Sequence, residues 1–430
     1  MRASATARGG IDLSAYARHR PASSKLFDHG AALPRGAEIA GPGPGVRADG
    51  LRVALFSGNY NCVRDGANKA LNRLVAHLLD RGAAVRIYSP AAPVPAFAPA
   101  GDLVPVPSIA IPGRPEYRLA TGLPARIRDD IRRFAPNIVH LSAPDLLNMK
   151  ARRFARSMGV PVVASLHTRF DTYFAYYGLG LLRRPATALL SHFYRGCDMV
   201  LAPNRFEAAG LEEMGVEPGA IRLWGRGVDT ETFTPALRDP AWRRAQGFAD
   251  EDMVLLFFGR LVLEKGLDVF ADTVGELRRR GHRARALVVG MGPAEQHFRD
   301  RLGDAVFAGH LEGQQLGRAV ASADILINPS VTEAFGNVNL EAMAAGLAIV
   351  SANVGSARAL IDDRMTGRLV APNPADLADA AMELMLRRGE RAALGRAAHR
   401  AACGYRWSDI LDGAIASYHV ASLPAGPAPG

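Results

Sequence analysis

Runs of apolar residues that predict buried strands alternate with amphipathic runs that predict helices, and this alternation occurs twice along the chain. The first series starts with LRVALFSG at Leu51, and the second starts with MVLLFFG at Met253. In each series a strand leads through a loop into a helix and then into another strand, which is the β-α-β unit of parallel sheets. We therefore predict an α/β protein with two Rossmann-like domains that face each other, with a ligand cleft between the carboxyl ends of their strands.

The two series divide the 430 residues into parts. The predicted parts are a flexible leader (1–50), a first domain (51–225), a second domain (226–405) and a C-terminal segment with a disordered tail (406–430). The Pro- and Ala-rich stretch 90–124 is expected to lie outside the core, and 220–250 is expected to link the domains. No run approaches the ~20 apolar residues of a membrane-spanning helix, and no secretory signal is recognisable. We therefore expect a cytoplasmic protein.

The positive charge of the chain is concentrated in its first half. The formal net charge is +10, from 52 basic and 42 acidic residues, and residues 51–225 hold 22 basic and 13 acidic ones. A basic domain suits an anionic partner, either a membrane surface or a nucleic acid. Since Lys occurs at only four positions, an Arg-rich composition is an alternative explanation. The three cysteines are far apart and form no C-x-x-C pair, so neither a disulfide framework nor a zinc site is predicted.

The segment NPSVTEAFGNVNLEAMAAG at 328–346 carries the most specific pattern. Glu333 precedes a predicted helix and Glu341 lies in its early turns, so the two carboxylates can face different parts of one ligand. We assign Glu333 to a sugar hydroxyl and Glu341 to ribose hydroxyls. The helix N-terminus would be formed by the amides around Gly336, Asn337 and Val338, and it favours a phosphate. A capped surface helix is the alternative when this segment is taken alone.

The segment FGRLVLEKG at 258–266 follows a predicted strand, where an active-site loop of an α/β domain lies. Arg260 and Lys265 are two cations that can neutralise a departing diphosphate without a metal ion. Two solvated surface cations are the alternative. Lys265 is the only Lys after residue 150 in this Arg-rich chain, which favours a specific role.

Weaker patterns provide further candidates. His167 ends the strand PVVASLH, where it can position a sugar or carry a proton, and a structural histidine is the alternative. Gly290 and Gly292 in VVGMGPAEQ permit close approach of a nucleotide, but residue 295 is Glu, so the G-x-G-x-x-G fingerprint of dinucleotide binding is incomplete. Gly66 lies in the loop before the first helix, where a small residue leaves room for a ligand and a plain turn is an equal explanation.

Together these motifs resemble those of the family 4 retaining glycosyltransferases with the GT-B fold, from about Leu51 to about Trp407. The resemblance depends most on the two glutamates around FGNVNL and on GRLVLEKG. It implies that the catalytic residues are His167, Arg260, Lys265 and Glu333, and that the donor is bound by Gly290, Gly292, Gly336, Asn337, Val338 and Glu341. It also implies that Gly66 and Arg226, the latter in WGRGVD, lie on the acceptor side.

The resemblance further implies a mechanism and a class of substrates. Retaining transferases of this family show no clear covalent nucleophile, so the implied reaction is a front-face displacement in which the departing diphosphate oxygen assists deprotonation of the acceptor hydroxyl. Within the family, the chain resembles GDP-mannose-dependent mannosyltransferases and glycolipid synthases. This implies GDP-mannose, UDP-glucose or UDP-glucuronate as donor, with no cofactor and no obligatory metal. The basic first domain then predicts a lipid acceptor and peripheral attachment to the anionic inner face of the cytoplasmic membrane.

Four alternatives to the lipid-directed transferase are open at this point, and one of them is a non-catalytic nucleotide-sugar sensor. A transferase acting on a soluble sugar or small molecule is the nearest of them. An NAD-dependent oxidoreductase with two Rossmann domains is the second, although the glycine fingerprint is incomplete. A nucleic-acid-binding protein is the third, but the second half of the chain is slightly acidic and lacks the aromatic interleaving of RNA-binding modules. We therefore predict no nucleic-acid partner.

Overall fold

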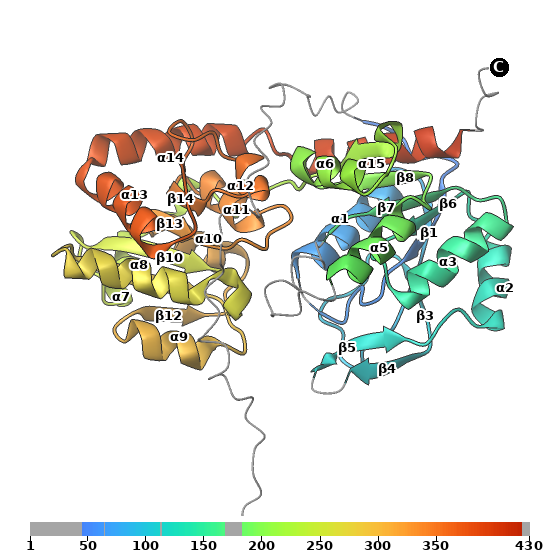
Figure 1. The fold of residues 1–430 in the computed structure, drawn as a ribbon, viewed down its shortest axis with the longest axis horizontal. Coiled ribbons are helices and arrows are strands. Elements are labelled where there is room, and N and C mark those ends of the chain that lie inside the picture. Colours follow the sequence, from blue (N-terminus) through green and yellow to red (C-terminus); the bar gives the residue numbers. More distant parts are fainter. Residues whose placement is uncertain (1–44, 64, 112–113, 168–182, 424–430) are drawn as a thin grey trace, which may run out of the picture.

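The computed structural model describes residues 45–63, 65–111, 114–167 and 183–423. Two lobes lie side by side, and each is built around a parallel β-sheet (Figure 1). This confirms the predicted α/β architecture with two Rossmann-like domains. Most of the predicted leader and the tail after residue 423 lie outside the described residues, whereas Ala48 is fully buried, so the folded part of the first domain begins before Leu51.

The first domain contains a seven-stranded parallel sheet in the order β3-β2-β1-β6-β7-β8-β9. Its strands are β1 (Arg52–Phe56), β2 (Ala84–Ser89), β3 (Asp102–Pro105), β6 (Ile138–Leu141), β7 (Val162–Ser165), β8 (Met199–Ala202) and β9 (Ile221–Leu223). The accompanying helices are α1 (Gly66–Asp80), α2 (Ala125–Phe134), α3 (Leu146–Ser157), α5 (Arg183–Tyr194) and α6 (Arg205–Glu213). The apolar run 53–56 is buried in β1 near the middle of this sheet, because helices cover both faces of a parallel sheet.

The stretch 90–124 contributes more structure than the sequence predicted. β3 pairs with β2 and forms the edge of the parallel sheet. Two further strands, β4 (Ser108–Ile111) and β5 (Arg114–Ala120), form a separate antiparallel sheet. The prolines that flank these strands conceal the strand pattern in the sequence, and prolines are tolerated at sheet edges because an edge residue needs no ladder donor.

The second domain contains a six-stranded parallel sheet in the order β12-β11-β10-β13-β14-β15. Its strands are β10 (Met253–Phe258), β11 (Ala284–Val289), β12 (Val306–Gly309), β13 (Ile325–Asn328), β14 (Ala348–Ala352) and β15 (Arg368–Val370). Its helices are α7 (Pro240–Ala245), α8 (Leu267–Arg279), α9 (Glu295–Leu302), α10 (Gly313–Ala321), α11 (Asn337–Ala344), α12 (Gly355–Arg358), α13 (Pro374–Leu386) and α14 (Arg388–Ala402). Apolar side chains on both faces of β10 are buried, and they divide between two hydrophobic clusters.

The segment 220–250 contains the crossing between the domains, but most of it is folded into one domain or the other. β9 completes the first sheet, whereas Val228, Phe233 and Phe248 are buried in the core of the second domain. Apolar residues spaced irregularly between prolines show no helical or strand period, so the sequence did not reveal their burial. The first crossing between the domains is therefore confined to a few residues around 224–227.

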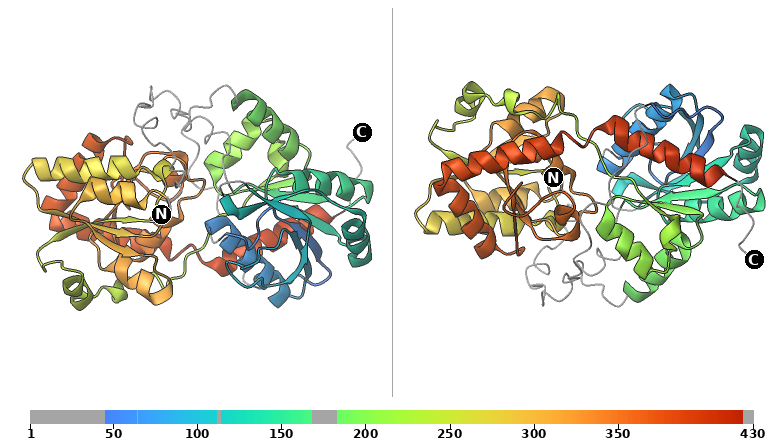
Figure 2. Two further views of the ribbon diagram at one scale, coloured as in Figure 1. Left: turned by 90° about the horizontal axis from the view of Figure 1, so that it is seen from below. Right: turned by 90° about the horizontal axis from the view of Figure 1, so that it is seen from above.

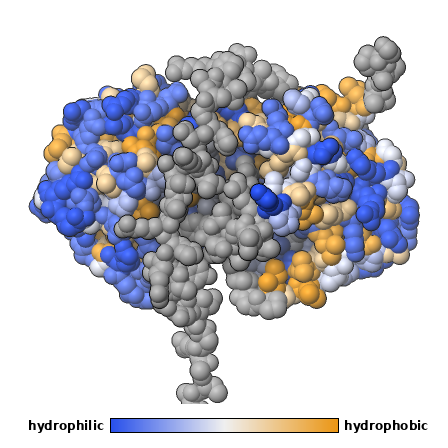
Figure 3. Space-filling view, viewed as in Figure 1, coloured by the Kyte–Doolittle hydropathy of each residue, from blue (hydrophilic) through white to orange (hydrophobic). Residues whose placement is uncertain are grey.

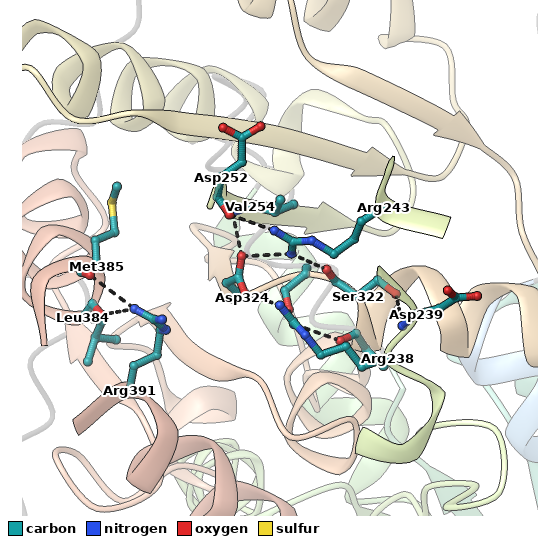
Figure 4. A network of polar contacts seen from close by, with 12 residues as sticks. Arg238, Asp239, Arg243, Asp252, Val254, Ser322, Asp324, Leu384, Met385 and Arg391 are labelled. Carbon is teal, nitrogen blue, oxygen red and sulfur yellow. Dashed lines mark hydrogen bonds and ion pairs between the residues drawn. The ribbon is translucent and has the colours of Figure 1, made fainter. Parts of the chain in front are cut away.

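An ion-pair network holds the later part of this segment against the second sheet. Figure 4 shows Asp324, which precedes β13, beside Arg238 and Arg243. The carboxylate of Asp324 accepts hydrogen bonds from Arg238 at 2.6 Å and from Arg243 at 3.1 Å. Arg243 is buried and also donates to the carbonyl of Ser322 at 2.7 Å. The buried guanidinium is thereby both paired with a carboxylate and hydrogen-bonded to backbone carbonyls, as a buried charge requires.

The C-terminal helix α15 (Trp407–Ser422) returns to the first domain. Figure 1 shows it in red above α1, and Figure 2 shows the chain crossing from one lobe to the other before it. Asp412 of α15 is 1% exposed and bonds to His77 at 2.6 Å and to Arg81 at 3.2 Å, both in or next to α1. The sequence predicted a boundary near residue 406 but not that the following segment folds with the first domain. Across the described part of the chain, no helix has the length and apolar character needed to cross a membrane.

Candidate active site

Two loops of the second domain that the sequence singled out lie side by side. The short 3-10 turn Leu263–Lys265 follows β10, and the loop with Glu333 follows β13, which is adjacent to β10 in the sheet. Nζ of Lys265 donates to Oε1 of Glu333 at 2.6 Å, and the two side chains are 22% and 20% exposed. The structure therefore joins the two motifs through one ion pair at the carboxyl edge of the sheet.

The helix α11 begins where the sequence predicted, directly after Gly336. Gly336 has a φ of 90°, a left-handed conformation that glycine adopts without strain, and no side chain caps the helix. The first amides of α11 are therefore not capped from within the segment, and a helix N-terminus of this kind attracts anions. A Cβ atom on Gly66 of the first domain would lie 2.5 Å from Nδ2 of Asn337, so the two domains meet closely at this point.

Gly290 and Gly292 lie behind the loop that carries Arg260. A Cβ on Gly290 would lie 1.9 Å from the carbonyl oxygen of Gly259, and one on Gly292 would lie 2.2 Å from that of Leu261. The close approach that these glycines permit is therefore to the loop 259–261 of the same domain. A Cβ on Gly259 would lie 3.6 Å from Cγ2 of Val338, so α11 also packs against this loop. Three of the predicted donor residues, Gly290, Gly292 and Val338, thus pack around the Arg260 loop.

His167 of the first domain contacts Arg226, which lies where the chain crosses between the domains. Nη2 of Arg226 lies 2.7 Å from Nδ1 of His167, and the guanidinium stacks over the ring of Trp224 at 4.8 Å. Burial lowers the pKa of Arg226 to about 10, so this residue is still cationic at neutral pH. Burial, together with the nearby charge of Arg226, holds the pKa of His167 well below its ordinary value. The imidazole is therefore neutral and its Nδ1 is already occupied by a donor.

Three residues that the sequence did not single out connect the two halves of the site. Nη1 of Arg260 donates to the hydroxyl of Tyr117 at 3.1 Å, and Nδ2 of Asn204 donates to the carbonyl of Ala334 at 2.7 Å. Asp65 caps α1 by accepting from the amide of Asn68, and it is close enough to interact electrostatically with Arg260. Burial raises the pKa of Asp65.

Of these three, Asp65 and Asn204 carried a local signal, because Asp65 caps α1 and Asn204 caps α6. The spelling D-G-A-N is typical of a helix start, which identifies the cap but not its neighbours in the second domain. Tyr117 and Asn204 reach the site from β5 and from the start of α6. Contacts of this kind depend on how the two domains are placed, and no sequence pattern encodes that placement.

Glu341 faces the first domain from α11. Burial raises the pKa of Glu341 to about 7, and the neighbouring Glu333 adds to the shift. Lys69 and Arg73 of α1 lower the pKa of Glu341, because their positive charges lie close to this carboxyl group across the domain boundary. At neutral pH, Glu341 therefore exchanges between the protonated and the ionised form.

Glu341→Gln is expected to stabilise the protein at pH 8 but not at pH 5. The folded protein binds the proton of the Glu341 carboxyl group more tightly than the unfolded chain does. The contribution of Glu341 to the free energy of unfolding therefore falls as the pH rises from about 4.5 through about 7. Glutamine stays neutral, so the Tm of the variant should exceed that of the wild type by about 2–4 °C or more at pH 8. Thermal unfolding at both pH values measures this, with Glu295→Gln in the first turn of α9 as the control. An equal Tm difference at the two pH values would contradict it.

Comparison with known proteins identifies the family. Residues 64–232 match the family described as Glycosyltransferase Family 4, and residues 252–387 match Glycosyl transferases group 1. The chain is 30% identical over 380 residues to the GDP-mannose-dependent alpha-mannosyltransferase of Mycobacterium tuberculosis, covering 86% of this chain and 96% of that protein. It is 29% identical over 365 residues to the sulfoquinovosyl transferase SQD2 of Arabidopsis thaliana, covering 83% of this chain and 71% of that protein.

The fold also matches solved structures. The Anabaena protein Alr3699/HepE, solved in complex with UDP and glucose, superposes with a TM-score of 0.66 at 17% identity, covering 87% of this chain and 100% of that one. Identity at this level supports the fold, and the extended sequence relationship to the mannosyltransferase supports the enzyme class. The oxidoreductase and nucleic-acid alternatives are therefore set aside. The chain belongs to the family 4 glycosyltransferases with the GT-B fold, and the enzyme is a hexosyltransferase.

Proposed function

We propose that this enzyme is a retaining glycosyltransferase that moves a hexose from a nucleotide diphosphate sugar to a hydroxyl group of a membrane lipid and forms an α-glycoside. The observation that carries the proposal is the meeting of Arg260, Lys265 and the N-terminus of α11 at one edge of the second sheet. Two cations and a row of amides provide complementary charge for a diphosphate. The pair formed by His167 and Arg226 belongs to the opposite, acceptor-binding domain.

On the donor side, each group is given one role. Lys265 and Arg260 stabilise the negative charge that develops on the departing diphosphate. Glu333 lies beside Lys265, where its carboxylate can accept a hydrogen bond from a sugar hydroxyl and stabilise positive charge on the ring. Glu341, which faces the first domain from α11, binds the ribose hydroxyls. The glycines behind the Arg260 loop hold that loop in place.

The proposed chemistry is a front-face displacement. The bond between the anomeric carbon and the diphosphate oxygen breaks, and a bond to the acceptor oxygen forms on the same face. The proton of the acceptor hydroxyl passes to the departing diphosphate oxygen. His167 is poorly arranged to take that proton, because Arg226 occupies its Nδ1 and Ser165 lies 2.8 Å from its Nε2. GDP-mannose holds its sugar in α-linkage, so a reaction like that of the alpha-mannosyltransferase relative would retain configuration.

The proposed lipid acceptor is supported by an exposed apolar surface on the small sheet of β4 and β5. Ile109 and Leu119 stand opposite each other in the register and are 55% and 47% exposed. Figure 3 shows hydrophobic residues gathered over this sheet at the lower right of the molecule. Tyr117, two residues before Leu119 on β5, contacts Arg260. The small sheet thus carries both the exposed apolar residues and a contact to the proposed reaction site.

Ile109→Ser combined with Leu119→Ser is expected to lower vesicle binding by about tenfold, because two aliphatic side chains no longer enter the interface. The measurement is co-sedimentation at low salt with vesicles of phosphatidylglycerol and phosphatidylcholine. Leu386→Ser is the matched control, since Leu386 is 67% exposed but lies on α13 of the second domain. Binding of the double variant at the wild-type level would remove this face from the proposal. A wild type that fails to bind would favour a soluble acceptor.

Donor binding tests the proposed function as a whole. Thermal unfolding is followed with GDP, UDP, GDP-mannose, UDP-glucose, UDP-glucuronate and NADH, each with magnesium and with a chelator. Stabilisation by one nucleotide family would identify the donor base, and the chelator arm tests the predicted independence from metal. The names of the relatives lead us to expect GDP-mannose or a UDP-sugar. A folded protein that responds to none of the nucleotide sugars would overturn the proposal.

A further inference from the structure

A chain of buried hydrogen bonds connects the candidate active site to the C-terminal helix. Nε2 of His167 lies 2.8 Å from the hydroxyl of Ser165, which lies 2.9 Å from Nε2 of His140. Nδ1 of His140 in turn contacts the hydroxyl of Tyr418 in α15, 278 residues away in the sequence. Ser165, His140 and Tyr418 are all fully buried.

The direction of the first two links follows from the chemistry of Arg226. A guanidinium only donates hydrogen bonds, so Nδ1 of His167 must be the unprotonated acceptor. A neutral imidazole then carries its hydrogen on Nε2 and donates it to the hydroxyl of Ser165. The opposite tautomer would point an N–H group at the guanidinium and leave two donors facing each other. The position of Arg226 therefore depends on the tautomer of His167.

We propose that Tyr418 and His140 are positioning residues for this site. The hydroxyl of Tyr418 accepts the Nδ1 hydrogen of His140, which leaves Nε2 of His140 as the acceptor for the hydroxyl of Ser165. Ser165 is then oriented to accept from His167. The chain holds His167 as the Nε2–H tautomer and so keeps its Nδ1 available for Arg226.

Packing around the chain supports this role. The ring of Trp224 packs edge-on against both imidazoles, with ring centroids 5.5 Å from that of His167 and 6.1 Å from that of His140. This packing restricts the rotation of both imidazoles. Arg226 is 4% exposed and also donates hydrogen bonds to the carbonyls of Trp224 and Gly225, at 3.3 Å and 2.8 Å. A buried guanidinium with neutral acceptors is sensitive to the loss of any one of them.

The contact also gives a functional reason for the return of α15 to the first domain. The Asp412 contacts with His77 and Arg81 anchor the helix to α1, and Tyr418 lies further along the same helix. A segment that follows the last strand of the second domain therefore completes the acceptor side of the site in the first domain.

The test is Tyr418→Phe, which removes the hydroxyl and keeps the ring. This inference rests on the proposed function for its kinetic part, but the tautomer of His167 is read without any substrate. Protein labelled with ¹⁵N-histidine reports which ring nitrogen carries hydrogen, and His167→Gln and His140→Gln assign the two signals. Tyr60→Phe is the matched control, because Tyr60 is also fully buried in the same hydrophobic cluster and its hydroxyl donates to Asn72 at 2.7 Å.

We expect His167 to be the Nε2–H tautomer in the wild type and a mixture in Tyr418→Phe. We also expect kcat to fall by about tenfold, with the donor KM changed by less than about twofold, while Tyr60→Phe keeps the wild-type kcat. Ser165→Ala, which cuts the chain in the middle, should reproduce the loss. An Nδ1–H tautomer in the wild type, an unchanged kcat in Tyr418→Phe, or equal losses in both tyrosine variants would overturn the inference. A wild type without transferase activity would instead count against the proposed function.

Discussion

Lys265→Ala is expected to lower kcat by about 10²-fold or more, because it removes a cation that stabilises the departing diphosphate. Lys265 lies at the end of the short turn that follows β10, and its Nζ is 2.6 Å from Oε1 of Glu333. Removing the cation also leaves the Glu333 carboxylate without this partner, next to Glu341. Donor affinity should fall as well, since the ground-state diphosphate is already negative. The loss in kcat is the larger one, because more charge develops on the leaving group in the transition state.

Steady-state kinetics with the donor identified by thermal unfolding measures this effect. Lys265→Arg restores the charge and should recover part of the activity, although the guanidinium has a different shape. Arg279→Ala is the matched control, since Arg279 is a cation of α8 in the same domain whose side chain is 73% exposed. Deleting a contact that stabilises charge in the transition state lowers kcat by a large factor. If Lys265→Ala keeps more than about a third of the wild-type kcat, Lys265 does not stabilise the leaving group.

Glu333→Gln is expected to lower kcat by about 10²-fold while changing donor Kd by less than about threefold. Glutamine has nearly the shape of glutamate, and its amide oxygen can still accept the hydrogen bond from Lys265. The variant therefore isolates the negative charge. That charge matters most when the anomeric carbon becomes positive, so the loss should appear in turnover rather than in binding.

Isothermal titration with the nucleotide sugar gives Kd, and initial rates give kcat. Glu295→Gln makes the same chemical change on α9, where Glu295 is half-buried and pairs with Arg299, and should leave both constants unchanged. Parallel losses in affinity and turnover would make Glu333 a ground-state binding residue. An unchanged kcat would show that its contact with Lys265 has no part in the reaction.

Much of the fold follows from patterns that are local in the sequence. The buried runs at 53–56 and 253–258 form central strands because a strand covered by helices on both faces must be apolar throughout. Gly336 marks the start of α11 because the chain there has a positive φ. The motifs around Arg260, Lys265 and Glu333 follow strand ends, and parallel strands end at one edge of a sheet. Their proximity therefore follows from the strand order once the sheet is formed.

The tertiary structure decided the features that depend on segments distant in the sequence. The return of α15 and the contact of Tyr418 with His140 join residues 278 positions apart, and an amphipathic pattern does not specify which sheet a helix will cover. The burial of Val228 and Phe233 in the second core had no periodic signal. The raised pKa of Glu341 and the engaged ring nitrogens of His167 arise from desolvation and from neighbours supplied by folding. The sequence alone thus determined which chemical groups are present and where strands end, whereas long-range packing determined their protonation and their partners.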